Sequence, residues 1–117
     1  MIPGPDRWRL EHMRRYSQKA LDLLGQGDAE ALEADEARLL AIIACVQIVG
    51  EAANRVTLET QARFPGVPWR PAIDTRNVIV HQYFEIKAEL IVDSVRRDLP
   101  LLIKALDRIL AEGGDIP

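Results

Sequence analysis

An all-α domain is the fold class that the sequence predicts, and three observations support it. Apolar residues recur at steps of three and four along most of the chain, as they do on one face of an α-helix. The composition favours Ala, Leu, Glu and Arg, which form helices readily, and only 5% of the residues are aromatic. Pro and Gly cluster between the periodic segments. A chain of 117 residues with 48% hydrophobic content suffices for one domain with one core, taken as residues 1–117.

The first helix is expected to follow Pro3, Gly4 and Pro5, with Asp6 as its N-terminal cap, and to end near residues 25–28. Its apolar positions recur at helical spacing, and they are Trp8, Met13, Tyr16, Ala20, Leu23 and Leu24. His12 lies on the same helix and has no Cys or carboxylate at ligand spacing. We therefore interpret it as a surface or packing histidine.

A long second helix is expected from about residue 34 to residue 63, because three- and four-residue steps continue through this stretch. Cys45 lies within its apolar run, which favours a small buried side chain over a reactive thiol. As the single cysteine, Cys45 cannot form an intrachain disulfide or a multi-cysteine metal site. Residues 64–68, rich in Pro and Gly, end this helix.

Three polar side chains interrupt the apolar pattern of the second helix, namely Gln47, Glu51 and Asn54. They form either a solvated edge or a polar patch that faces the segment around Arg76, and the spacing does not decide between the two. Small residues beside them, Gly50 among them, would allow another helix to approach closely.

The third helix is expected over residues 69–82, with Ile73, Val80 and either Val78 or Ile79 on its buried face. Rigid placement of this segment matters, because it carries the residues with the most distinctive chemistry.

A fourth helix is expected from about residue 86, and its apolar stripe continues in phase across Pro100. Either the helix is kinked there, or two helices meet end to end with Asp98 as a cap. Residues 1–5 and 112–117 are expected to fray. Four or five helices with short connections predict an up-and-down bundle, which is expected to form a homodimer with two-fold symmetry.

The net charge of −3 and the pI near 5.4 argue against a surface coated with basic residues for non-specific nucleic-acid binding. A local basic cleft stays possible because arginines greatly outnumber lysines, although each could simply pair with a nearby carboxylate. The arginines considered for such a cleft are Arg7, Arg9, Arg14, Arg15, Arg63, Arg70, Arg76, Arg96 and Arg97. No apolar segment approaches the roughly 18 residues of a membrane span, and the amino terminus has no secretory pattern. A cytoplasmic protein without a membrane partner is therefore expected.

The segment from Arg76 to Tyr83 combines a guanidinium, a carboxamide, an imidazole and a phenol around three β-branched apolar residues. A permanent cation near a titratable imidazole suits phosphate chemistry. On an ideal helix Arg76 and His81 lie about 140° apart, whereas Asn77 and His81 share one face. Arg76 could still reach His81 with its long side chain, or the helix could be distorted. The chain lacks a Gly-rich phosphate loop, His-Glu-x-x-His and Gly-x-Ser-x-Gly, so no metal or cofactor is expected.

Acid–base chemistry on RNA fits these residues. His81 could remove the proton of a 2′-hydroxyl, while Arg76 stabilises the negative charge that develops on the phosphate. Cleavage also needs an acid for the departing 5′-oxygen, and two copies of His81 across a dimer axis would supply both roles.

Four stretches in order, Ile48–Ala53, Val67–Trp69, Arg76–Phe84 and Asp98–Pro100, resemble the HepT toxins of the HEPN superfamily. The resemblance extends roughly from residue 6 to residue 110, and its most specific portion is Arg-Asn-x-x-x-His-x-Tyr. It implies an α-helical bundle, a homodimer with its cleft at the two-fold axis, and metal-independent endoribonuclease activity.

The resemblance also implies roles for single residues. Arg76 and His81 would be the catalytic pair and Asn77 a supporting polar residue. The implied partner is a minimal nucleotidyltransferase antitoxin, which would inhibit the toxin by transferring AMP to Tyr83. The sequence departs from the family pattern at Asp74 and Thr75, where a glycine and an apolar residue are common. Asp74 would either weaken RNA binding or orient Arg76.

Two other functions remain open on the sequence. In the first, the chain is a non-catalytic helical dimer that binds and regulates a nucleotidyltransferase, and Arg76 and His81 make structural contacts. In the second, it is a nucleotide-binding regulatory domain, which would bind mononucleotides saturably without turning RNA over.

Overall fold

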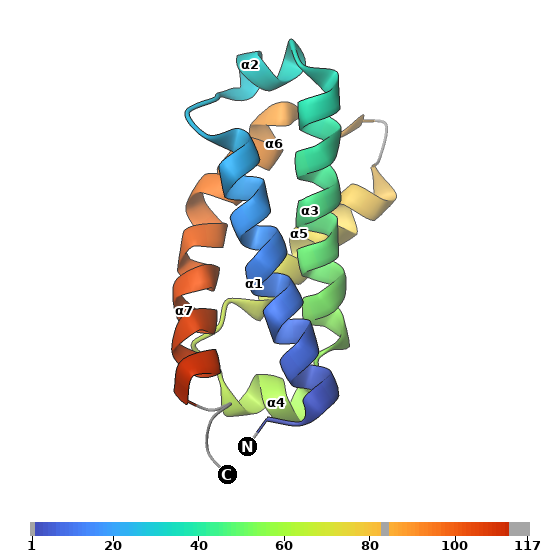
Figure 1. The fold of residues 1–117 in the computed structure, drawn as a ribbon. Coiled ribbons are helices and arrows are strands. Elements are labelled where there is room, and N and C mark those ends of the chain that lie inside the picture. The colour runs from blue at the N-terminus through green and yellow to red at the C-terminus, as the bar shows by residue number, and fades with distance from the viewer. Residues whose placement is uncertain (1, 83–84, 113–117) are drawn as a thin grey trace.

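The computed structural model describes residues 2–82 and 85–112, and every regular element among them is a helix (Figure 1). The predicted all-α class is therefore confirmed. In chain order the elements are α1 (Gly4–Leu24), α2 (Ala29–Glu33), α3 (Glu36–Arg55), α4 (Leu58–Arg63), α5 (Trp69–His81), α6 (Ala88–Asp93), the π-helical turn η2 (Ser94–Asp98) and α7 (Leu99–Glu112).

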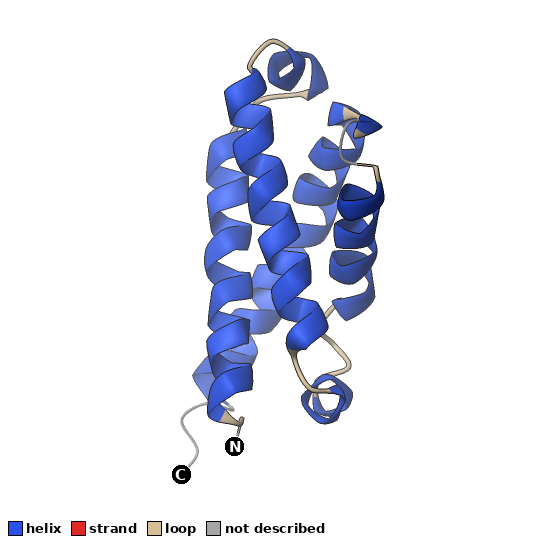
Figure 2. Ribbon diagram, turned by 90° about the vertical axis from the view of Figure 1, so that its right-hand side faces the viewer, coloured by secondary structure: helices blue, strands red, loops and turns tan. Residues whose placement is uncertain are grey.

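The long helices run up and down, as expected for a bundle (Figures 1 and 2). Helix α1 packs against α3 on one side and against α7 on the other, and α5 lies against the opposite side of α3. The short helices close the ends, with α2 near α6 and α4 at the end that holds the amino terminus. The largest fully buried side chains come from all the long helices, and they include Leu10, Met13, Ile42, Ile79, Ile91, Leu102 and Leu106.

Helix α1 begins at Gly4, so the prediction that Asp6 caps this helix is wrong. Pro3 occupies the cap position and Pro5 lies in the first turn, where its missing N–H is not needed and its fixed φ suits a helix. Asp6 is 1% exposed and instead accepts hydrogen bonds from Thr57 N at 3.1 Å, Thr57 Oγ1 at 2.6 Å and Thr60 Oγ1 at 2.6 Å. Burial raises the pKa of Asp6, but these hydrogen bonds outweigh it and leave the pKa below its usual value.

The first helix ends as predicted, at Leu24 followed by Gly25 with φ of 52°. This left-handed conformation favours glycine because a Cβ would be strained there. Helix α2 was not expected from the sequence. Its start follows from Asp28, whose side chain accepts a hydrogen bond from Ala31 N at 2.9 Å, and from Leu32, which is fully buried.

The prediction of one continuous helix over residues 34–63 is wrong, because α3 and α4 are separate helices. Val56 has an extended backbone, and Thr57 caps α4 by accepting a hydrogen bond from Thr60 N at 3.3 Å. The apolar periodicity continues through Val56, which is 2% exposed, so the break leaves no gap in the buried pattern.

Of the two alternatives expected at Pro100, two helices that meet end to end are excluded, because residues 88–112 form one continuous helical run. Pro100 has no N–H to donate, and in an α-helix its ring would collide with the carbonyl group four residues earlier, that of Arg96. The wider π turn over residues 94–98 relieves this conflict just before the proline. Asp98 therefore lies within the helical run and is not a cap.

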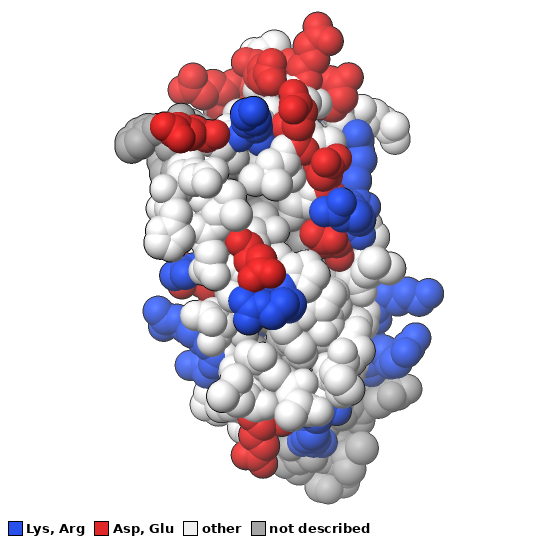
Figure 3. Space-filling model, turned by 180° about the vertical axis from the view of Figure 1, so that it is seen from behind, with Lys and Arg blue, Asp and Glu red and all other residues white. Residues whose placement is uncertain are grey.

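Acidic side chains gather at the end of the bundle that carries α2, whereas Lys and Arg lie mostly along the middle and lower half of the face in Figure 3. Among the described residues, no helix is both long enough and apolar enough to cross a membrane. Fraying was predicted for residues 1–5 and 112–117, of which residues 1 and 113–117 lie outside the described residues. Gly4 and Pro5 belong to the first turn of α1, and Glu112 is the last residue of α7.

Candidate active site

Helix α5 carries most of the predicted site and is fixed firmly to the bundle. It begins after Pro68, and the indole Nε1 of Trp69 donates a hydrogen bond to Phe64 O at 3.0 Å. Ile73 and Ile79 are buried as predicted, at 7% and 0% exposure, but Val80 is 42% exposed and the prediction of its burial is wrong. The buried face passes through Ile79, and Val80 lies about 100° further round the helix.

Arg76 lies where α5 crosses α3 most closely. A Cβ built on Gly50 would come within 2.1 Å of Arg76 Cβ and 2.7 Å of Ala72 O. Only glycine therefore fits at position 50 without displacing α5, and this contact explains why a small residue stands at that point of α3.

The guanidinium of Arg76 is held by two oxygen acceptors. Its Nε donates to Glu51 Oε1 at 2.8 Å, and its Nη1 donates to Asn77 Oδ1 at 2.9 Å. The side chains of Arg76 and Glu51 are 24% and 33% exposed, so the pair is fixed against the bundle but open to solvent. Glu51 thus faces the Arg76 segment. For this residue the structure supports the interpretation as a polar patch over that as a solvated edge.

Part of the Arg76 guanidinium remains available to a ligand. A guanidinium carries five N–H donors, and Nη2 of Arg76 makes no hydrogen bond to residues in the described ranges. A phosphate oxygen could accept from Nη2 while Glu51 and Asn77 hold Nε and Nη1. The arrangement presents a cation in one orientation without leaving its charge uncompensated.

His81 lies apart from the ion pair. It is the last residue of α5 and is exposed, and its side chain forms no hydrogen bond or ion pair with the described residues. No hydrogen bond therefore joins the side chains of Arg76 and His81 within one chain. Tyr83, the predicted site of AMP transfer, lies outside the described residues.

Asp74 does not orient Arg76. Its Oδ1 lies 2.7 Å from Nη2 of Arg70, one turn earlier on α5, and both side chains are well exposed. The acidic group that departs from the family pattern is thus paired with a neighbouring arginine. The positive charge of Arg70 therefore offsets much of the negative charge of Asp74.

Six of the nine arginines considered for a basic cleft pair individually with carboxylates, as the simpler interpretation expected. The ion pairs are Arg7–Glu11, Arg9–Asp6, Arg14–Asp107, Arg70–Asp74, Arg76–Glu51 and Arg97–Asp98. Cys45 is buried at 8% exposure, and burial raises the pKa of its thiol, although the charge of Lys19 opposes this. The prediction of a buried small side chain is confirmed.

A surface pocket of about 300 Å³ adjoins the Arg76 site between α1 and α3. Its lining residues are Trp8, Arg9, His12, Tyr16, Ile48, Glu51, Ala52 and Arg55. Trp8 was expected on the apolar face of the first helix, but its side chain is 61% exposed. The i, i+4, i+8 spacing of Trp8, His12 and Tyr16 was the signal that could have revealed this surface row.

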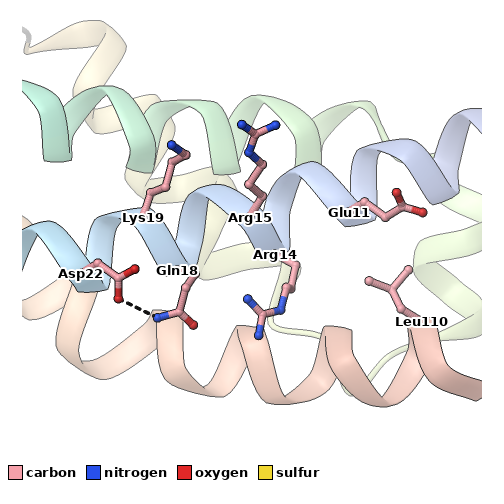
Figure 4. Close-up of a pocket in the computed structure, with 7 residues that line it drawn as sticks. All are labelled: Glu11, Arg14, Arg15, Gln18, Lys19, Asp22 and Leu110. Atoms are coloured by element: carbon pink, nitrogen blue, oxygen red, sulfur yellow. Dashed lines mark hydrogen bonds between the residues drawn. The ribbon is translucent and has the colours of Figure 1, made fainter.

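A second pocket, of about 380 Å³, lies between α1 and α7 (Figure 4). Arg14 points toward α7 and pairs with Asp107 at 2.8 Å, while Gln18 Nε2 donates to Asp22 at 2.9 Å. The carboxylates of Glu11 and Asp22 lie toward opposite ends of this pocket, with Arg14, Arg15 and Lys19 between them. The pocket contains none of the predicted site residues. Within the described ranges, no group of three or more His, Cys, Asp or Glu side chains could hold a metal ion.

The fold and site define an all-helical protein that presents a fixed arginine at its surface, with a histidine five positions further along the same helix. A family model described as ribonuclease HepT-like matches residues 13–109 of this chain. The chain belongs to this HepT-like family, and the resemblance found in the sequence is confirmed.

Several curated proteins are similar to the chain. "Putative RNase MJ1380" of Methanocaldococcus jannaschii is 33% identical over 67 residues, which cover 57% of this chain and 62% of that protein. "Putative RNase TTE0752" of Caldanaerobacter subterraneus is 24% identical over 101 residues, 86% of this chain and 90% of that protein. "Probable ribonuclease HepT" of Thermococcus cleftensis is 28% identical over 68 residues, 58% of this chain and 62% of that protein. The first and third matches thus span less than two thirds of those relatives. No solved structure matches the chain.

Proposed function

We propose that this protein is a metal-independent endoribonuclease, the toxin of a toxin–antitoxin pair, that acts as a homodimer in the cytoplasm. Membership of the HepT-like family and the ribonuclease names of its relatives support the reaction. The single structural observation that carries the proposal is Arg76, whose Nε and Nη1 are held by Glu51 and Asn77 while Nη2 has no partner in the described ranges. In this proposal residues 1–117 form one HEPN-like domain, and RNA is the substrate.

The reaction is an attack within the RNA backbone. His81 of one protomer takes the proton of a 2′-hydroxyl, and the 2′-oxygen then forms a bond to the adjacent phosphorus. The bond from phosphorus to the 5′-oxygen breaks, and protonated His81 of the other protomer gives its proton to that oxygen. The products are a 2′,3′-cyclic phosphate and a 5′-hydroxyl, so atoms and protons balance without a metal or a cofactor.

Arg76 supplies the charge stabilisation in this scheme. Negative charge increases on the non-bridging phosphate oxygens in the transition state, and a fixed guanidinium stabilises it without reorganising. Asn77 supports the orientation through its hydrogen bond to Nη1. The exposed position of His81 at the end of α5 leaves it accessible to a second protomer and to RNA.

Inhibition would follow from a nucleotidyltransferase antitoxin that transfers AMP to Tyr83. AMP on a phenol two residues from His81 would add bulk and negative charge where an RNA phosphate should bind. Intact-mass measurement after incubation with the partner and ATP should show AMP additions that disappear in Tyr83→Phe. An unchanged mass in the parent protein would remove this part of the proposal.

Cleavage of single-stranded RNA in excess chelator tests the catalytic proposal. His81→Ala and Arg76→Ala should each lower the rate by at least about a hundredfold, in line with the usual contribution of acid–base groups. Arg97→Ala is a matched control, because its side chain is exposed and its loss removes the same charge elsewhere. Equal rates in all four proteins would show that the two residues are not catalytic.

A non-catalytic dimer that regulates a nucleotidyltransferase is the second candidate function. The observation that favours it is the ion pair of Arg76 with Glu51, which gives the arginine a structural role within one chain. In that case the parent protein would be inert toward RNA but would still form a dimer and bind its partner. Size-exclusion chromatography beside the cleavage assay distinguishes the two candidates.

A further inference from the structure

The pocket between α1 and α3, hereafter the Trp8 pocket, contains features of a binding site that catalysis at Arg76 and His81 does not use. We propose that it binds one nucleotide of single-stranded RNA, with the base stacked on Trp8 and the phosphate beside Arg55. The inference rests on the proposed function in one respect, namely that RNA is the ligand of this protein.

The aromatic part of the pocket is ordered in advance. The rings of Trp8 and His12 lie edge to face, with centroids 4.0 Å apart and planes at 68°, and His12 lies 5.8 Å from Tyr16. Trp8 is nevertheless 61% exposed, so most of its surface faces solvent. An exposed indole supported by a neighbouring ring can stack on a nucleobase with little loss of side-chain freedom.

The cations around the pocket complement a phosphate. The guanidinium of Arg55 has no partner within the described part of the chain. Its backbone carbonyl accepts a hydrogen bond from Arg9 Nη1 at 2.8 Å, so two arginines meet at this end of the pocket. Arg9 is partly neutralised by Asp6, whose oxygen lies 3.5 Å from Nη1, which leaves Arg55 as the unpaired charge.

The Trp8 pocket is continuous with the proposed catalytic site through Glu51. This residue lines the pocket, and its carboxylate holds Nε of Arg76 at 2.8 Å. A base bound at Trp8 would therefore place the adjoining part of the RNA strand near the arginine that contacts the reacting phosphate. The volume of about 300 Å³ is at the lower end of small-ligand pockets and suits one nucleotide.

A protein segment, such as one from a second copy of the chain, is the competing occupant. Ile48 is 37% exposed beside Trp8 and could contribute apolar contact area. An apolar protein surface would, however, cover Arg55 without pairing its charge, which is costly. The combination of an open aromatic face and an unpaired guanidinium therefore favours a nucleotide.

Binding of a 2′-O-methylated RNA oligonucleotide tests the inference separately from catalysis, because the blocked 2′-oxygen prevents cleavage. Fluorescence anisotropy of a labelled oligonucleotide would give the affinity, and quenching of Trp8 fluorescence would report stacking, since Trp69 is buried at 9% exposure. Trp8→Ala should weaken binding about tenfold, Trp8→Phe should weaken it less, and Arg55→Gln should reduce its salt dependence. Leu101→Ala is the matched control, because Leu101 is also 61% exposed but lies on α7.

The outcomes separate the two proposals. Loss of affinity in Trp8→Ala with normal far-UV circular dichroism supports the nucleotide site, whether or not the parent cleaves RNA. Equal affinity in Trp8→Ala and the parent, or no binding by the parent, overturns it. If Trp8→Ala instead dissociates a dimer without changing RNA affinity, the pocket is a protein interface and the inference fails. The ribonuclease proposal fails independently, if Arg76→Ala and His81→Ala cleave RNA as the parent does.

Discussion

Gly50 and Arg76 face each other across the crossing of α3 and α5, so closely that a Cβ on the glycine would lie 2.1 Å from the Cβ of the arginine. Real Cβ atoms do not approach so closely, and the carbonyl of Ala72 would also lie within 2.7 Å. The position of Arg76 relative to Glu51 therefore depends on the absence of a side chain at residue 50.

Gly50→Ala should lower the free energy of unfolding by about 1–3 kcal/mol, because the added methyl group overpacks the interface. This outcome reverses the usual preference of helices for alanine over glycine, about 1 kcal/mol. Urea denaturation measures the change. Gly66→Ala is the control, since no atom lies within 4 Å of a Cβ at that position. Two variants of equal stability would show that α3 and α5 are not in close contact at Gly50.

Glu51→Gln should disturb the orientation of the Arg76 guanidinium while changing the folding stability little. The Glu51–Arg76 pair is partly exposed, so its loss should cost less than about 1 kcal/mol of folding stability. If Arg76 is catalytic, a misplaced guanidinium should lower kcat about tenfold or more. Removal of a negative charge beside the site should lower KM for RNA at the same time.

Steady-state RNA cleavage measures both parameters for Glu51→Gln. Asp74→Asn provides the comparison, because Asp74 pairs with Arg70 and does not contact Arg76. An unchanged kcat for Glu51→Gln would mean that Arg76 needs no help from this carboxylate.

The pH dependence of stability should report the buried carboxyl of Asp6. Its pKa is lowered from 3.8 in the folded protein, so folding favours the charged form. The resulting stabilisation is fully present above the unfolded pKa and is lost as the pH falls below about 4, through the folded pKa. Asp6→Asn should therefore cost about 1–3 kcal/mol at pH 7, and the difference from the parent should shrink at pH 3.

Urea denaturation at pH 7, 5, 4 and 3 would test this dependence. Asp93→Asn is a suitable control, because Asp93 is exposed on α6. A difference between Asp6→Asn and the parent that stays constant across the series would show that Asp6 does not titrate with a lowered pKa.

Cys45 should react slowly with thiol reagents in the folded protein. Burial both shields its sulfur and raises its pKa, so the reactive thiolate is scarce at pH 8. The rate of reaction with a disulfide reagent should rise steeply across the urea unfolding transition. A rapid reaction in the absence of urea would place this thiol at the surface.

The sequence predicted those features that depend on neighbouring residues. The helical class, the end of α1 at Gly25 and the extent of α5 follow from local periodicity and from Gly and Pro positions. Glu51 was also a candidate to face Arg76, because it is one of few polar side chains in an apolar helix. The contact itself joins residues 25 positions apart, and spacing alone could not decide it.

The features that the sequence analysis missed depend on contacts between distant segments. The break between α3 and α4 involves Thr57, which donates to Asp6 over a separation of 51 residues. The same contact explains why Asp6, a favoured capping residue, lies inside α1 instead. The Trp8 pocket needs the pairing of α1 with α3, so Trp8 could not be distinguished from a core residue by periodicity.

The π turn over residues 94–98 contains about one residue more than the same turn of an α-helix would. This extra residue sets the rotation of α7 about its own axis. Deleting one residue there would let the backbone return to regular α-helical winding, but α7 would turn by about 100° about its axis. Leu102 and Leu106, now 1% and 0% exposed, would leave the centre of the bundle. The number of residues in this short segment is therefore more tightly constrained than the type of residue at each position.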